Sequence, residues 1–194
     1  MTGLEIAEEK IAHCKAEKVP YLNLSDLGLE SLPESIGELT WLGALSLSRN
    51  KLSNIDAIAP LVNLHKLSFS NNNIECIDVV NNLPKIRHIF MKHNKISDIS
   101  PLKNMERLKK VEANHNKISN LQYLTHMELL VFLDVAHNAL EDINFILEIP
   151  SLIWLCIEEN PLKPYVLNDF KCALPNLRHF TYKASSSCTN TLST

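Results

Sequence analysis

The sequence has little glycine, and its few glycines are not gathered into one loop. Only four occur in 194 residues, at positions 3, 28, 37 and 43. Glycine-rich loops cradle phosphates and present backbone N–H groups to oxyanions, and no such loop is present. A P-loop, a dinucleotide fingerprint and a metalloprotease motif are also missing. We therefore expect neither enzymatic activity nor a cofactor.

The sequence also lacks the marks of secreted, membrane-spanning and nucleic-acid-binding chains. No apolar run is long enough to cross a membrane, and Met1 leads into an acidic segment instead of a signal peptide. The five cysteines are scattered without a C-x-x-C pair, so we expect reduced thiols and a cytoplasmic location. A bacterial protein delivered into a host cytosol by a non-cleaved route would look the same. The net charge of −3 gives no support for binding nucleic acid or an anionic membrane.

What the sequence does contain is an internal repeat. Each copy has the frame apolar-x-x-apolar-x-apolar-x-x-Asn-x-apolar, as in LGALSLSRNKL at residues 42–52. An asparagine amide has two donors and an acceptor, so stacked asparagines can pair backbone groups that would otherwise be buried without partners. We expect such a structural ladder from the six asparagines that recur every 22 residues: Asn50, Asn72, Asn94, Asn116, Asn138 and Asn160.

The frame predicts one short strand and one coiled return in every repeat. Leu45-Ser46-Leu47 alternates apolar and polar residues as a strand does. After each asparagine an apolar residue follows at every third position, which is typical of a 3₁₀-like coil. Stacked copies bury a continuous core that one copy cannot bury alone. Residues 19–183 are thus predicted to form an α/β solenoid with a parallel sheet of seven or eight strands.

The two ends of the chain differ from the repeats. Residues 4–16 carry apolar side chains at helical spacings of three and four. We expect residues 1–18 to form a cap helix over the first repeat, because a solenoid end exposes its core; a free binding helix is the alternative. Residues 184–194 show no apolar period and are predicted to be disordered.

The repeat resembles the leucine-rich repeat over residues 19–182. Its 22-residue length with N-x-I-x-x-I-x-x-L is similar to the class that includes the nuclear regulator of protein phosphatase 1 and axonemal dynein light chains. The first repeat, LNLSDLGLESLP, is more similar to bacterial and Roco-type repeats, because Leu27 stands where the asparagine should be. The end resembles the family's C-terminal cap, built on Tyr165 and Phe170, although Phe180-Thr181 replaces its common Leu-Asp pair.

The resemblance implies a right-handed superhelix with a concave parallel β-sheet, and a binding role. Short cytosolic members of the class are usually adaptors or regulatory subunits of enzymes. The resemblance therefore implies another protein as partner, and an enzyme whose active site becomes covered is one such partner. We expect the chain to be a monomer on its own.

Outward strand positions are predicted to form the binding surface, because side chains alternate along a strand. Large aromatic residues are not needed at such positions, and interfaces are enriched in them. The alternative is that these aromatic residues pack on each other or under the C-terminal cap. The predicted partner-binding residues are Phe90, Phe132, Trp154, His88, Lys92, Lys110, Glu112, Asp134 and Glu158.

Charge along this surface is predicted to be sorted, basic in the middle repeats and acidic toward the C-terminal end. A partner of complementary polarity could be oriented by it; the alternative is solvated charge without a partner. The basic residues are Arg49, Lys66, Arg87, Lys92, Lys109 and Lys110, and the acidic ones beyond them are Asp134, Glu158 and Glu159.

Two other constellations compete with a binding role. Cys156, Asp134 and His179 are predicted on adjacent strands and superficially meet the needs of a cysteine nucleophile. An open sheet cannot exclude water from such a site. His93, His115 and His137 each precede a repeat asparagine, but a straight row of imidazoles makes poor tetrahedral geometry, so we expect no metal site.

The sequence therefore favours a non-catalytic protein-interaction module that binds, and regulates by inhibition or scaffolding, a partner protein. One alternative is a structural or adaptor subunit of a cytoskeletal or axonemal assembly. Another is a bacterial effector that acts on an enzyme in a host cytosol.

Overall fold

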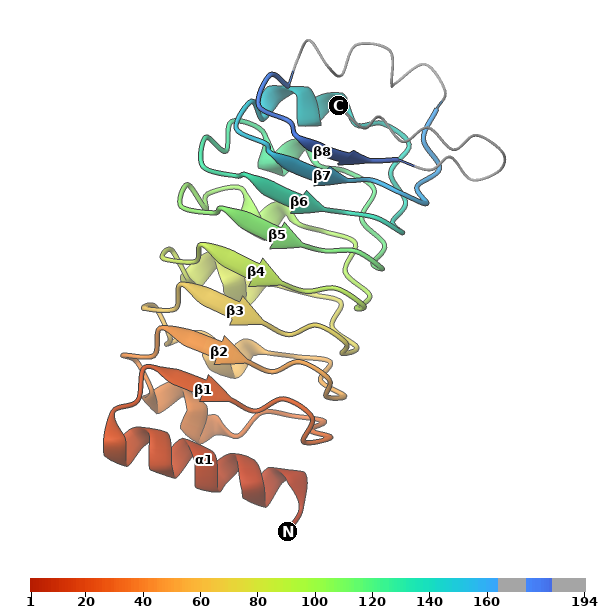
Figure 1. Cartoon of the computed structure of the whole chain (residues 1–194). Helices are drawn as coiled ribbons and strands as arrows, with labels where there is room; N and C mark the ends of the chain where they lie inside the picture. Colours follow the sequence, from red (N-terminus) through yellow and green to blue (C-terminus); the bar gives the residue numbers. More distant parts are fainter. Residues whose placement is uncertain (164–173, 183–194) are drawn as a thin grey trace.

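The protein is one stack of repeats behind a single N-terminal helix (Figure 1). The computed structural model describes residues 1–163 and 174–182. The predicted disordered tail at 184–194 and the cap residues Tyr165 and Phe170 lie outside the described residues. Helix α1 spans Gly3–Glu17. The sheet has eight parallel strands in sequence order: β1 Tyr21–Asn23, β2 Ala44–Ser46, β3 Lys66–Ser68, β4 His88–Phe90, β5 Lys110–Glu112, β6 Phe132–Asp134, β7 Trp154–Cys156 and β8 His179–Thr181.

The sheet is open and uncurled, and each strand is three residues long (Figure 1). In β1 to β6 the central residue is buried and the two flanking residues are more exposed, as in Ala44-Leu45-Ser46 of β2. In β7 Cys156 is buried as well, and in β8 the central Phe180 is partly buried. Neighbouring strands pair in register over one 22-residue step, so Leu45 lies opposite Leu67. The predicted parallel solenoid with a cap helix is confirmed.

Behind the sheet, each return path from β1 to β7 contains a short 3₁₀ helix, and no α-helix lies there within the described residues. The apolar residue at every third position turns inward once per 3₁₀ turn; Ile55, Ile58 and Leu61 are all buried in this way. The 3₁₀ helices are η1 Glu34–Glu38, η2 Asp56–Ile58, η3 Asp78–Asn82, η4 Ser100–Leu102, η5 Gln122–Leu124 and η6 Asn144–Glu148.

Helix α1 covers the open end of the first repeat. Its N-terminus is fixed by a capping box, in which the Thr2 side chain accepts from the Glu5 N–H and the Glu5 carboxylate accepts from the Thr2 N–H. Ala7, Ile11 and Cys14 form its buried face against β1 and η1. In the described part of the chain, no helix combines the length and the apolar content needed to cross a bilayer.

The repeat asparagines join the repeats by hydrogen bonds. The side-chain oxygen Oδ1 of Asn116 accepts a hydrogen bond from the backbone N–H of Ile96 at 3.0 Å. Its amide group donates to the carbonyl oxygens of Met91 and Ala113, both at 3.0 Å. The same pattern recurs at Asn50, Asn72, Asn94, Asn138 and Asn160. Each asparagine thus pairs backbone groups of its own repeat and of the one before it.

The residue that precedes each repeat asparagine is in the left-handed region. His115 has φ 54°, and Asn71 at the equivalent position has φ 58°. Histidine, asparagine and aspartate tolerate this region better than β-branched or bulky residues do. This explains the His-Asn pairs of the sequence by backbone geometry. The residues of this left-handed column are Asp26, Arg49, Asn71, His93, His115, His137 and Glu159.

Candidate partner-binding face

The outward side chains of the eight strands form one continuous surface, which we call the sheet face. It consists of the first and third residue of each strand and, for β1 to β7, the residue two places beyond the strand. The parallel register aligns these positions, so that Lys110 lies beside Phe132 and Glu112 beside Asp134. All nine predicted partner-binding residues lie on this surface, and none of them is fully buried.

Phe132 and Trp154 form a stacked pair on this face. Their ring centroids are 4.1 Å apart and their planes differ by 4°. Adjacent strands hold the two residues opposite each other, which is why identical positions in neighbouring repeats stack. Both side chains remain partly exposed, so mutual packing covers one side of each ring and leaves apolar surface in contact with solvent.

Lys110 joins the stacked pair to Phe90. Its ammonium nitrogen lies 3.8 Å from the Phe132 ring centroid and 5.5 Å from that of Phe90. The same nitrogen forms an ion pair with Glu112 at 2.9 Å. A cation over an aromatic face is attracted by the ring quadrupole. These contacts assemble five of the predicted residues into one cluster, which we call the aromatic cluster: Phe90, Lys110, Glu112, Phe132 and Trp154.

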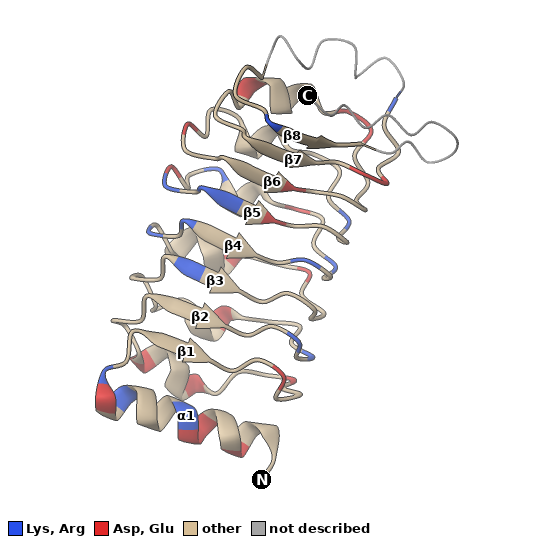
Figure 2. Cartoon of the chain, viewed as in Figure 1, with Lys and Arg blue, Asp and Glu red and all other residues tan. Residues whose placement is uncertain are grey.

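The other predicted residues do not join this cluster. Asp134 accepts hydrogen bonds from the Asn114 amide and from the Ala136 N–H, the latter at 3.2 Å. Lys92 and Glu158 lie beyond the ends of their strands, and within the described residues no hydrogen bond or ion pair holds either side chain. Figure 2 shows basic residues at the starts of β3 and β5 and acidic ones at the ends of β5 and β6.

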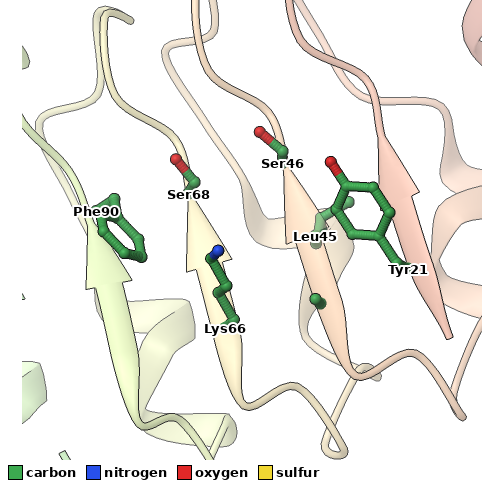
Figure 3. A pocket seen from close by; sticks show the side chains of 7 residues that line it. Tyr21, Leu45, Ser46, Lys66, Ser68 and Phe90 are labelled. Carbon is green, nitrogen blue, oxygen red and sulfur yellow. The ribbon is translucent and has the colours of Figure 1, made fainter. Parts of the chain in front are cut away.

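The structure also shows a hollow on the small-residue end of the face, which the sequence did not predict (Figure 3). It has a volume of about 260 Å³. Tyr21 and Phe90 stand at its two ends, and Ser46 and Ser68 lie between them. The space arises because the small side chains of Ala44 and Ser46 on β2 and Ser68 on β3 lie between the large side chains of the flanking strands. The sequence signal for this hollow was the run of small outward residues Ala44, Ser46 and Ser68 between the large Tyr21 and Phe90.

A polar hollow of about 410 Å³ adjoins it. Two serine pairs line it: Ser25 with Ser46, and Ser48 with Ser68, each with oxygens 2.7 Å apart. The buried Ser70 hydroxyl, also at this hollow, has no hydrogen-bond partner in the described part of the chain. The face is thus divided into a hydroxyl-rich half and an aromatic half.

Cys156, Asp134 and His179 lie on adjacent strands as expected, and register aligns Asp134 with Cys156, but His179 does not align with either of them. Register places His179 opposite Trp154, and Thr181 opposite Cys156. Burial raises the pKa of the Cys156 thiol, although its hydrogen bond with Thr181 acts in the opposite direction. A thiol with a raised pKa is mostly protonated at neutral pH and is a weak nucleophile.

The three histidines before the asparagines form a stack instead of a chelating cluster. Neighbouring ring centroids are 4.1 Å apart, with interplanar angles of 12° for His93 and His115 and 11° for His115 and His137. Nitrogen lone pairs lie in the ring planes, so parallel rings do not direct them at one point. Within residues 1–163 and 174–182, no three His, Cys, Asp or Glu side chains are grouped to hold a metal ion.

Comparisons with known proteins agree with this architecture. The family described as Leucine Rich repeats (2 copies) matches residues 62–104. An internalin (inlF) of Listeria monocytogenes is 27% identical over 87% of this chain, with a TM-score of 0.81. The chain spans 50% of that internalin's length. No curated protein matches the chain in sequence. The chain has the leucine-rich repeat fold, and residues 62–104 match the repeat family itself.

Two further solved structures share the fold at lower identity. Internalin C2 of Listeria monocytogenes is 18% identical, covers 95% of this chain and 86% of its own, and has a TM-score of 0.82. A Shigella effector leucine-rich repeat domain is also 18% identical, with 94% and 90% of the two chains covered and a TM-score of 0.67. At these identities the similarity concerns the fold alone.

Proposed function

We propose that this protein is a non-catalytic interaction module that binds a partner protein through its sheet face and thereby regulates it. The observation that carries the proposal is the half-exposed stack of Phe132 and Trp154, with Lys110 held over Phe132. Protein interfaces concentrate aromatic residues at their centres. The leucine-rich repeat fold is a common scaffold for such surfaces.

We infer regulation of the partner because the described residues offer a binding surface and no catalytic group. The described residues contain no assembled nucleophile and base, so an effect on a partner must come from covering or holding it. Binding centred between β4 and β7 would place the aromatic cluster against the partner, with Lys92, Asp134 and Glu158 at the rim. The proposal includes an enzyme as partner, whose active site this protein covers. It also includes a monomeric free state and a location in the cytoplasm, either of its own cell or of a host cell into which it is delivered.

The test compares Phe132→Ala/Trp154→Ala with wild type in binding to a partner captured on wild-type protein. A truncated aromatic anchor costs about 2 kcal/mol or more, or about thirtyfold in affinity. We expect at least this loss for Trp154→Ala alone, with a nearly unchanged melting curve because the ring is already partly exposed. Ser46→Ala/Ser68→Ala, on the hydroxyl-rich half, is the control and should bind normally.

Stoichiometry and partner activity then separate the roles. One tight enzyme partner whose turnover falls or rises on binding supports regulation, whereas obligate co-purification with several chains supports a structural subunit. Unchanged binding by Trp154→Ala, together with hydrogen-exchange protection of α1 or of the 3₁₀ helices, would contradict the placement on the sheet face.

A further inference from the structure

A second surface feature runs along the starts of the strands and shares Lys110, Phe132 and Trp154 with the aromatic cluster. In each repeat it consists of the first strand residue and the residue before it. The preceding residues are joined by backbone hydrogen bonds from repeat to repeat, for example Val131 N–H to the Lys109 oxygen at 3.0 Å and Ile153 N–H to the Val131 oxygen at 2.9 Å. We call these paired positions from β3 to β8 the strand-start stripe.

The stripe is basic over β3, β4 and β5. Its residues there are His65-Lys66, Arg87-His88 and Lys109-Lys110. Four of these six side chains are exposed, and His88 and Lys110 are partly exposed. Burial lowers the pKa of His88, and the neighbouring positive charges, with Lys66 the largest, lower it further. Of these six residues only Lys110 forms an ion pair within the described part of the chain, so this block attracts negative charge.

The same stripe becomes apolar over β6 and β7. Phe132 and Trp154 occupy the first strand positions, and Val131 and Ile153 precede them. Val131 is 36% exposed and Ile153 39%, although both are large aliphatic residues. Leu129, in the turn before β6, is 46% exposed. Arg178 and His179 continue the stripe beyond this patch, so basic residues lie on both sides of it.

We infer that the strand-start stripe binds a partner's polypeptide segment in which an acidic run adjoins bulky apolar residues. This inference rests on the proposed function, because it names the chemistry of the segment that a protein-binding face would take. The acidic run lies over β3 to β5, and the apolar residues lie on Val131, Phe132, Ile153 and Trp154. Acidic residues of the partner segment that follow its apolar residues lie over Arg178 and His179.

The length of the segment follows from strand spacing. Parallel strands lie about 4.8 Å apart, so β3 to β7 spans about 19 Å, which about six residues of extended chain cover at about 3.3 Å each. A short segment therefore reaches both parts of the stripe at once.

A polypeptide fits the stripe better than an anionic membrane does. The acidic side chains Glu112 and Asp134 stand two residues farther along the same strands as Lys110 and Phe132. A flat anionic bilayer pressed on the stripe would approach both carboxylates, whereas a single extended chain that follows the stripe approaches only Glu112, which Lys110 pairs at 2.9 Å. The net charge of −3 disfavours a bilayer further.

The experiment selects displayed random 12-residue peptides on the wild-type protein and measures synthetic copies by fluorescence anisotropy. We expect enriched peptides to carry an acidic run beside two apolar residues. Lys66→Glu/Lys109→Glu should weaken their binding at least tenfold at low salt, and Val131→Ser/Ile153→Ser should do so with little salt dependence. Lys103→Glu/Lys117→Glu makes the same charge change at exposed positions off the stripe and should bind like wild type. Melting curves check that each variant is folded.

Three results overturn the inference: no peptide is enriched, the enriched peptides lack acidic residues, or the two stripe variants bind like wild type. Vesicles of phosphatidylserine in phosphatidylcholine test the membrane alternative. The inference is also overturned if wild-type protein binds these vesicles and the stripe variants do not. If the stripe variants bind a folded partner normally while Phe132→Ala/Trp154→Ala does not, this inference fails and the proposed function stands. If none of these variants weakens that partner, the proposed function fails as well.

Discussion

Removing one rung of the asparagine ladder should destabilise the whole stack by an amount that the hydrogen bonds set. In Asn116→Ala the Ile96 N–H loses its acceptor at 3.0 Å, and two carbonyl oxygens lose a donor. An orphaned buried donor costs about 1–3 kcal/mol, whereas a carbonyl oxygen has a second lone pair and suffers less. We expect Asn116→Ala to lower the free energy of unfolding by about 1–3 kcal/mol, and Asn94→Ala to do the same.

Equilibrium unfolding in urea measures this loss, with the slope of the transition showing that the same surface is exposed in each variant. At about 2–4 °C per kcal/mol for a chain of this size, the melting temperature should fall by about 2–12 °C. Asn104→Ala is the matched control, because Asn104 is exposed and donates no side-chain hydrogen bond among the described residues. Asn63 is a poorer control, since its amide donates to the Thr40 oxygen at 2.8 Å. Equal midpoints for Asn116→Ala and wild type would refute the ladder account.

Two further predictions concern the cap helix and the histidine stack. Gly3→Ala should lower the melting temperature although alanine is the better helix former, because a Cβ there would lie 1.7 Å from the Leu27 carbonyl oxygen; Glu9→Ala, at an exposed position of α1, is the control, and an unchanged or raised melting temperature would show that the helix shifts freely. Burial, then His137 and His93, lower the pKa of His115, although Asp134 opposes the shift. The unfolded chain therefore binds this proton more readily, and stability should fall as pH drops below the ordinary histidine pKa of about 6.5. His115→Asn, the residue found natively at 71 in the left-handed column, should flatten urea midpoints measured between about pH 7.5 and 5; an equally steep fall would contradict the assignment.

The repeat frame predicted the backbone well, because both of its periods have a direct physical cause. Leu45 and Leu67 alternate with outward residues, so a strand is the only element that buries them and leaves Ser46 on the surface. The fixed period of 22 then requires identical positions to stack, and it follows that Phe132 and Trp154 face each other.

Features that depend on individual side chains were not predictable in this way. The position of Lys110 between Phe90 and Phe132 depends on the rotamer of a long side chain, and nothing in the repeat period fixes that. The hollow between Tyr21 and Phe90 arises from the sizes of residues on four neighbouring strands. His179 lies on the strand next to Cys156, as predicted, but register aligns it with Trp154, two residues away along the strand.

The asparagine rungs have a consequence for how such a protein can change its length. Each rung bonds only to its own repeat and to the repeat before it, and the bonds of Asn94 and Asn116 are equivalent. Excising or duplicating one 22-residue unit at matching positions would therefore recreate the same junction. Each such event would change the distance between the basic repeats and the apolar patch by about 4.8 Å, one strand spacing. Spacing on the surface could thus vary in whole steps while the interior stays chemically the same.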